Sequence, residues 1–239
     1  MTEHLVKAYE EELSRLHSLV PALGVLAGAQ LDAATASAEE RDPGAGASVL
    51  RREPEADRLA REIDNLAIRI LALRQPVAVD LRAVVAALRI GNELERICDH
   101  TEDFAQRSIA LNVAKIEPVP SLVQLSHYGT TMVKDAMHAY RQLDAAEAQE
   151  VWDRDNGLDQ RYSALFRELL TFMLEDPRRI SANTQMLFMA RTVERIGDRA
   201  TNIAEIVHYL VAGIPVEEAR RKADATKTMM LSAPIAPSR

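Results

Sequence analysis

Aromatic residues and cysteine are scarce in this chain of 239 residues. Aromatics make up only 4% of the sequence, although 47% of it is hydrophobic. A β-sandwich or barrel needs more β-branched and aromatic residues, so this scarcity favours closely packed helices rich in Ala and Leu. The single cysteine, Cys98, excludes an intrachain disulfide and indicates a reducing compartment.

The sequence also lacks a long uncharged apolar run and an excess of basic residues. No stretch of about 18 uncharged apolar residues occurs, and the first ten residues carry charge where a signal peptide needs an apolar core. We therefore expect no transmembrane segment and a cytoplasmic location. The formal net charge of -7 argues against nucleic acid and anionic lipid as partners of the bulk surface.

Helical periodicity runs through most of the chain and is interrupted at breaks marked mainly by proline. Proline disfavours helix at the residue before it, so these breaks indicate helix ends. They predict an all-α fold of six helices, at about 3–40, 46–74, 77–113, 120–142, 145–175 and 179–212. The remaining residues, 214–239, are expected to form a loosely ordered tail.

The two halves of the chain repeat each other at an offset of about 100 residues. The string ERICD at 95–99 recurs as ERIGD at 194–198, and Asp42 and Asp57 find counterparts in Asp144 and Asp159. A fixed offset across several elements indicates internal duplication. We therefore predict two tandem homologous antiparallel three-helix bundles, residues 1–116 and 117–213.

Acidic residues recur on the side of the third and sixth predicted helices that lies away from the apolar stripe. Glu95, Asp99 and Asp103 follow one another at intervals of about one helical turn. Glu194 and Asp198 repeat this spacing in the sixth helix. These positions predict acidic side chains that point outward into solvent.

The second and fifth predicted helices add acidic pairs with the same spacing. Glu53 precedes Asp57 by one turn, and Asp155 precedes Asp159 in the same way. In an antiparallel bundle, the early part of one helix lies level with the late part of the next. Each half is therefore predicted to gather about four or five carboxylates on one solvated patch.

Two interpretations of these patches remain open. Like charges one turn apart destabilise a helix by a few tenths of a kcal/mol per pair, and a multivalent cation between them would relieve this repulsion. Oxygen ligands without thiolate or imidazole suit Mg, Ca, Mn or Fe better than structural zinc. Alternatively, neighbouring arginines form ordinary surface salt bridges with the acids: Arg61, Arg96, Arg195 and Arg199.

The sequence offers no constellation typical of a catalytic site. It shows no nucleophile with its base and no strand followed by a phosphate-binding loop. A carboxylate-bridged metal enzyme built on a helical bundle needs Glu-x-x-His on two helices. Here Cys98 and Gly197 stand three residues after Glu95 and Glu194. We therefore predict that the protein is not an enzyme, with such a bundle enzyme as the remote alternative.

Four segments together resemble the PhoU family of phosphate-specific transport accessory proteins. They are ERIGDRATNIAE at 194–205, ERICDHTED at 95–103, LRQPVAVDLR at 73–82 and MLEDPR at 173–178. The resemblance extends over about residues 1–213. It implies two three-helix bundles in a cytoplasmic protein that is often a homodimer.

The resemblance also implies a function and partners. Proteins of this family act as negative regulators when phosphate is plentiful. They restrain the phosphate-specific ABC transporter, through its ATPase subunit, and hold a sensor histidine kinase in its signalling-off state. A metal-free helical adaptor remains the alternative interpretation of the sequence.

The resemblance further implies metal sites at the E(D)xxxD motifs, with Mn, Fe or Mg expected more readily than Zn. With the paired acids of the neighbouring helices, the candidate ligands are Glu53, Asp57, Glu95, Asp99, Asp103, Asp155, Asp159, Glu194 and Asp198. The chain departs from the family pattern at Asn202, which stands where the first motif has Asp103, and at Ala60, where an acid is expected. The corner at 42–47 also appears looser than is usual.

Overall fold

The computed structural model describes residues 2–213, with side chains from residue 7 onward, and this part of the chain is helical almost throughout. Within it no strand occurs, which confirms the all-α prediction. The predicted tail, 214–239, lies outside the described residues. In chain order the elements are α1 (Thr2–Glu39), α2 (Pro43–Arg74), α3 (Ala78–Val113), α4 (Pro120–Gln142), α5 (Ala145–Asp153), α6 (Asp155–Glu175), the 3-10 helix η1 (Pro177–Arg179) and α7 (Ile180–Ala212).

The six-helix arrangement is confirmed with one correction, because the predicted fifth helix is interrupted at Arg154. The backbone N–H of Arg154 donates to the carbonyl of Val151 over 3.2 Å, a 3-10 contact that tightens the chain. From α4, the Tyr128 hydroxyl donates to the Arg154 carbonyl over 3.2 Å, and Asp135 pairs with the Arg154 guanidinium at 2.8 Å. Contacts with α4 therefore hold the break, and they are not visible in local periodicity.

Equivalent aspartates begin the second helix of each bundle. The Asp42 carboxylate accepts a hydrogen bond from the Gly44 N–H at 2.7 Å, and Pro43 occupies the first turn of α2. Asp144 accepts from the N–H groups of Ala146 and Glu147 at the start of α5. Both satisfy backbone donors that a helix N-terminus leaves free. The corner at Asp42, expected to be loose, is therefore capped and helical from Pro43 onward.

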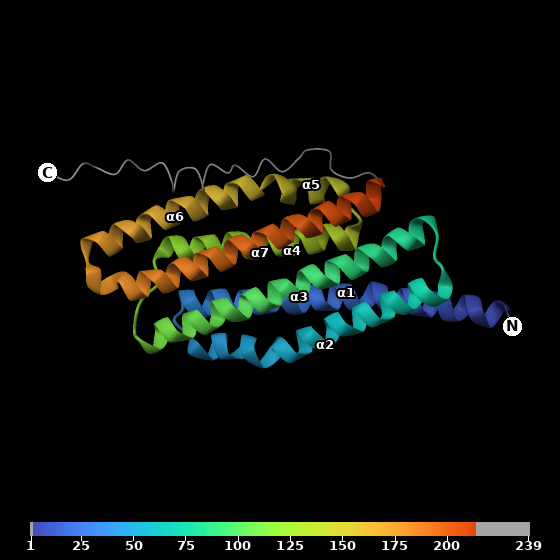
Figure 1. The fold of residues 1–239 in the computed structure, drawn as a ribbon, viewed down its shortest axis with the longest axis horizontal. Coiled ribbons are helices and arrows are strands. Elements are labelled where there is room, and N and C mark those ends of the chain that lie inside the picture. The colour runs from blue at the N-terminus through green and yellow to red at the C-terminus, as the bar shows by residue number, and fades with distance from the viewer. Residues whose placement is uncertain (1, 214–239) are drawn as a thin grey trace.

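The helices form two bundles that lie side by side (Figure 1). The first consists of α1, α2 and α3, and the second of α4, the α5–α6 pair and α7. The two bundles meet chiefly where α3 packs against α7, and also where α1 packs against α4. Two homologous three-helix bundles are therefore confirmed. The connection from Val113 to Pro120 contains the predicted domain boundary.

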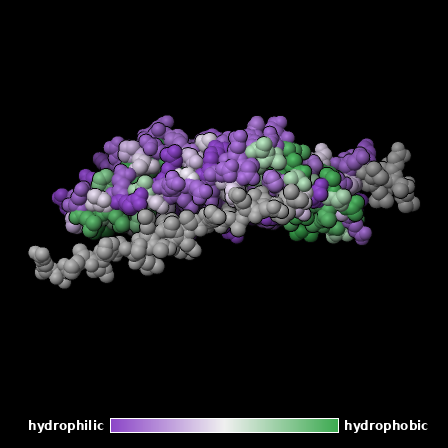
Figure 2. Space-filling view, turned by 90° about the horizontal axis from the view of Figure 1, so that it is seen from above, coloured by the Kyte–Doolittle hydropathy of each residue, from purple (hydrophilic) through white to green (hydrophobic). Residues whose placement is uncertain are grey.

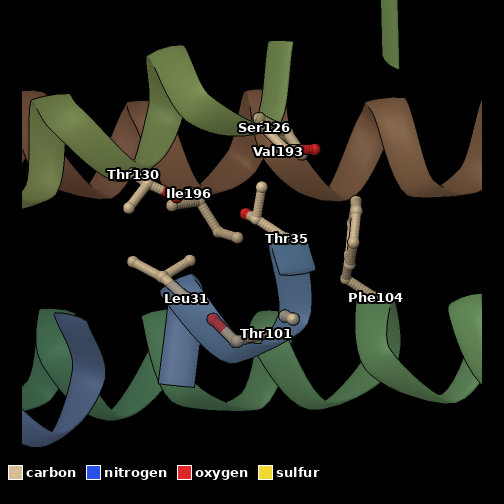
Figure 3. Close-up of a pocket in the computed structure, with 9 residues that line it drawn as sticks. Leu31, Thr35, Thr101, Phe104, Ser126, Thr130, Val193 and Ile196 are labelled. Atoms are coloured by element: carbon tan, nitrogen blue, oxygen red, sulfur yellow. The ribbon is translucent and has the colours of Figure 1, made fainter. Parts of the chain in front are cut away.

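A small cavity lies between the two bundles, where α1, α3, α4 and α7 meet (Figure 3). Thr35, Thr101, Ser126 and Thr130 line it among apolar residues. Its volume is about 10 Å³. A cavity of this size has room for at most one water molecule, so it is no site for phosphate or a metabolite.

One segment, Lys7–Glu39 of α1, is long and apolar enough by length and composition to cross a membrane. Half of its most apolar window is buried inside the first bundle and against α4. The core helix of a globular fold has this same property. On the face seen in Figure 2, the middle of the molecule is hydrophilic and hydrophobic residues gather toward its two ends.

Candidate functional site

Acidic residues of α2 and α3 face one another in the first bundle. We call this group the first acidic cluster; it comprises Glu53, Asp57 and Asp64 of α2 with Glu95, Asp99 and Glu102 of α3. Asp57, Asp64 and Glu95 line an open hollow on the surface, together with Arg61, Arg96 and Arg199. The predicted convergence of the two helices is therefore present in the first half.

The carboxylates of this cluster repel one another. Burial raises the pKa of Glu53, and the charges of Asp57, Glu102 and Asp99 raise it further. Burial likewise raises the pKa of Glu95, as do the charges of Asp99, Asp57 and Asp64, while Arg96 opposes them. Each shift means that the ionised carboxylate is held at a free-energy cost. A positive charge in the hollow would lower that cost.

The positive partners already present are exposed arginines. Arg61 reaches Asp57 at 3.2 Å, and Arg96 lies 3.5 Å from Glu95 and 3.4 Å from Asp99. The side chains of Arg61 and Arg96 are 67% and 60% exposed. Ion pairs between such exposed groups are worth only about 0–1 kcal/mol. The salt bridges that sequence reasoning kept as an alternative are therefore present but weak.

Asp103, which the sequence analysis grouped with Glu95 and Asp99, instead lies at the contact between α3 and α7. Its carboxylate accepts hydrogen bonds from Arg107 and, over 3.0 Å, from the Thr192 hydroxyl of α7. Burial alone would raise the pKa of Asp103, but these hydrogen bonds hold it below its usual value. Glu102, which sequence reasoning missed, lies near Glu53 instead. Its position one turn after Asp99 is the signal that could have identified it.

Glu194, in the second half, corrects the predicted helix face. It was expected to point into solvent, but only 8% of its surface is exposed. The Arg191 guanidinium lies 2.8 Å from its carboxylate. Burial raises the pKa of the nearby Tyr162 and the Glu194 charge adds to this, while Arg191 opposes both. Glu194 is therefore a buried carboxylate that pairs with a half-exposed arginine of its own helix.

The other acids of the second half also have protein partners. The Thr201 hydroxyl donates to Asp155 over 3.1 Å, and the Trp152 indole N–H donates to Glu205 over 3.2 Å. Asp159 and Asp198 also interact with neighbouring groups. The predicted residues of the second half therefore lie on α6 and α7, the counterparts of α2 and α3, but their neighbours are different.

The acidic residues of the two halves have different partners, and neither group encloses a metal ion among the described residues. Among the described residues, no three His, Cys, Asp or Glu side chains converge closely enough to enclose a metal ion. Hard cations such as Mg²⁺ commonly use one or two carboxylates and keep several waters, so an open cluster suffices for them. The first acidic cluster has such donors, and its positive partners are the exposed side chains of Arg61 and Arg96. In the second half, Arg191 pairs with Glu194, and the Thr201 hydroxyl donates to Asp155.

Other reactive side chains near the clusters have structural surroundings. Cys98 is buried, and burial raises the pKa of its thiol far above the usual value, so the thiolate is disfavoured. Burial also lowers the pKa of His100, with Arg195 and Arg199 adding to the effect. Neither residue is part of a nucleophile–base pair in the described contacts.

The family model, the related sequences and the solved structures described below all belong to one family. The model of the PhoU domain matches residues 20–108 and again residues 122–207. A phosphate-specific transport system accessory protein PhoU homolog from Caulobacter vibrioides is 42% identical over 94% of this chain and 98% of its own length. The corresponding protein from Xylella fastidiosa is 42% identical over 95% of this chain and 97% of its own length.

Solved structures show the same similarity. The crystal structure of PhoU from Pseudomonas aeruginosa superposes with a TM-score of 0.82 at 35% identity, covering 86% of this chain and 100% of that chain. The phosphate transport system regulatory protein PhoU from Streptococcus pneumoniae has a TM-score of 0.80 at 26% identity, covering 88% of this chain and 100% of that chain. The arrangement of two bundles is therefore shared with these proteins.

Proposed function

The chain belongs to the PhoU family, and on that premise we propose that it regulates phosphate uptake and the phosphate-starvation response. It acts in the cytoplasm as a homodimer and has no catalytic activity of its own. It binds the ATPase subunit of the phosphate ABC transporter and a sensor histidine kinase. Through these contacts it restrains transport and keeps the kinase in its signalling-off state when phosphate is plentiful.

One observation carries the proposal: relatives named as accessory proteins of the phosphate-specific transport system match this chain over nearly its full length and theirs. Such coverage includes both bundles and both acidic motifs. The site chemistry supports an output through binding, because the described contacts contain no catalytic constellation.

Exposed apolar residues at equivalent corners of the two bundles support protein binding as that output. Leu73, at the end of α2, is 66% exposed, and Leu174, at its counterpart in α6, is 85% exposed. Val79 and Ile180 follow at the start of α3 and α7 and are exposed as well. Apolar side chains at protein surfaces supply the desolvated centre of protein interfaces.

A cation is part of the proposal, and the first acidic cluster would hold it. Glu53, Asp57, Glu95 and Asp99 supply carboxylate oxygens that suit Mn, Fe or Mg, with Zn less readily accepted. These carboxylates would hold the ion, and its positive charge would offset their mutual repulsion. The second candidate function, a metal-free helical adaptor, predicts the same partners without any dependence on metal.

The relay is tested by measuring the affinity of the sensor kinase for this protein with and without the ATPase subunit. Regulation through two partners requires that binding of one changes the affinity for the other. We expect kinase affinity to change about fivefold or more when the ATPase subunit is present, in line with ordinary coupling free energies. Equal affinities would refute the relay.

Two matched variants test the contact surfaces in the same assay. Leu73→Asp and Leu174→Asp each place a charge on one exposed corner, at equivalent positions of the two bundles. Since both side chains are exposed, neither change disturbs the core. We expect each variant to weaken binding of at least one partner. Unchanged affinities for both partners in both variants would exclude the corners as contact surfaces.

A further inference from the structure

We propose that the small cavity between the two bundles is a binding site for one internal water molecule, which joins α3 of the first bundle to α4 of the second. Residues that carry a hydroxyl group line this cavity from α1, α3 and α4 (Figure 3): Thr35, Thr101, Ser126 and Thr130. The site is independent of the proposed partners and of any metal, because it depends only on the contact between the bundles.

The hydroxyl group of Thr130 is the first observation that points to a ligand. It is buried and has no hydrogen-bond partner among the described residues. Only 5% of the surface of Thr130 is exposed, so bulk solvent does not supply a partner. Buried hydroxyl groups without a partner are costly, and most bind either protein or an ordered water molecule. Since Thr130 lines the cavity, a water molecule there provides the missing partner.

Two further hydroxyl groups of the lining have acceptor capacity to spare. The Thr101 hydroxyl donates to the Ile97 carbonyl over 2.7 Å, and the Ser126 hydroxyl donates to the Leu122 carbonyl over 2.9 Å. A hydroxyl oxygen that donates its one hydrogen can still accept hydrogen bonds. The water molecule therefore accepts from Thr130 and donates to Thr101 and Ser126. About three hydrogen bonds are usual for a buried water.

The size and chemistry of the cavity select water over other ligands. Its volume of about 10 Å³ is close to the minimum that one water molecule needs. The described residues that line it carry no charge, and those without a hydroxyl group are apolar: Leu31, Ala34, Phe104, Val193 and Ile196. An ion in such surroundings would be unpaired, which is strongly unfavourable. A single neutral molecule that both donates and accepts hydrogen bonds fits the site.

The internal duplication provides a second region for comparison, and an apolar side chain fills it. The register that relates the two helix-capping aspartates places Met137 at the position of Thr35, and Gly24 at the position of Ser126. Met137 packs so closely on Gly24 that a Cβ atom added there would lie 2.6 Å from the Cε atom of Met137. The Thr35 side chain is shorter than that of Met137, which accounts for the open space beside Ser126.

The hydroxyl groups are likewise confined to the side of the duplication that has the cavity. Gly28 stands at the position of Thr130, and Ala200 at the position of Thr101. With Gly24 and Met137, all the counterparts of the hydroxyl-bearing residues are therefore apolar. A cavity left only by loose packing among apolar side chains stays dry. Here open space and hydroxyl groups occur together, which is the arrangement that a water site requires.

Magnetic relaxation dispersion of solvent water, which counts water molecules with long residence times in the protein, tests this inference on the full chain. Thr130→Val keeps the shape of the side chain but removes its hydroxyl group. Thr35→Met places the side chain of the counterpart in the cavity. We expect each variant to hold one long-lived water molecule fewer than wild type. Circular dichroism verifies that both are folded.

Thr131→Val is the matched control on the same helix. Thr131 is exposed, and its hydroxyl donates to the His127 carbonyl, so this change should leave the count of long-lived water molecules unaltered. A crystal structure of the wild-type chain is the independent measurement, and it should show one density peak about 2.7–2.8 Å from Oγ1 of Thr130. A cavity without density, or an unchanged count in folded Thr130→Val or Thr35→Met, would overturn the inference.

Discussion

At the residue scale, side chains at equivalent helical positions have acquired different surroundings. Glu95 lies in an open hollow among other carboxylates, while Glu194 is buried against Arg191. Helical periodicity places both on the same face, because it considers one helix at a time. The difference comes from residues on other turns and other helices, such as Tyr162 and Arg191. The local pattern therefore predicted the location of both motifs but not their exposure.

Gly197 is a position where the close approach of two helices requires the absence of a side chain. A Cβ atom added there would lie 2.0 Å from Cδ2 of Leu158 in α6, which is itself buried. We predict that Gly197→Ala lowers the free energy of unfolding by about 1–3 kcal/mol, as overpacking does in other cores. Chemical denaturation with a circular dichroism readout measures this change.

Gly28 provides the matched control for that substitution. It also lies inside a helix, but the nearest atoms that a new Cβ would meet are those of Lys134, at 3.8 Å. Since Ala is a better helix former than Gly, Gly28→Ala should raise the free energy of unfolding by about 0.5–1 kcal/mol. Equal effects of the two substitutions would contradict the close packing inferred at Gly197.

At the scale of elements, contacts between helices decide where a helix breaks and how neighbours pair. The Tyr128 hydroxyl of α4 holds the carbonyl of Arg154 at the junction of α5 and α6. We predict that Tyr128→Phe, which removes only this donor, lowers the free energy of unfolding by about 0.5–1.5 kcal/mol. Thermal or chemical unfolding of the variant beside wild type checks the prediction. A neutral effect would mean that other contacts hold the break.

The pairing of α1 with α2 is predicted to depend on pH through Glu12. Arg74 lies 2.8 Å from the Glu12 carboxylate, and its hydrogen bond holds the pKa of Glu12 below the usual 4.5. A lowered folded-state pKa contributes stability above the unfolded pKa, and that contribution disappears as the pH falls through the folded pKa. Glu12→Gln should therefore be less stable than wild type at pH 7. The difference should shrink below pH 4.5 in urea unfolding curves measured across that range.

For the whole molecule, the duplication also shapes the contact between the bundles. Asn202 donates to Glu93 over 3.2 Å, and Thr192 donates to Asp103 over 3.0 Å. The duplication relates the two contacts to each other, because Asn202 is the counterpart of Asp103 and Thr192 is the counterpart of Glu93. The bundles therefore meet with approximate two-fold symmetry along α3 and α7.

Such an interface predicts that the two bundles unfold together. Buried side chains of both halves line the cavity where α1 and α3 meet α4 and α7, so neither bundle is complete on that side alone. Calorimetry of the full chain should show one transition whose van't Hoff and calorimetric enthalpies agree. Two separate transitions would show that the halves are independent.

Most of the fold could be predicted from the sequence, but the way the halves meet could not. Proline positions and the offset of about 100 residues indicate the helices and the duplication. The contact of Asp103 with Thr192 joins residues far apart in the chain, so no local spacing reports it. For this reason Asp103 was placed with the first acidic motif, whereas its described partners lie at the interface between the bundles.

The central claim, that the chain restrains the response to phosphate, is tested most directly in a strain from which its gene is deleted. The measurement is expression of a phosphate-starvation reporter in phosphate-rich medium, with the wild-type chain restored on a plasmid as the control. The account predicts that the reporter stays on in the deletion strain and is switched off again by the restored chain. Normal repression of the reporter in the deletion strain would contradict it.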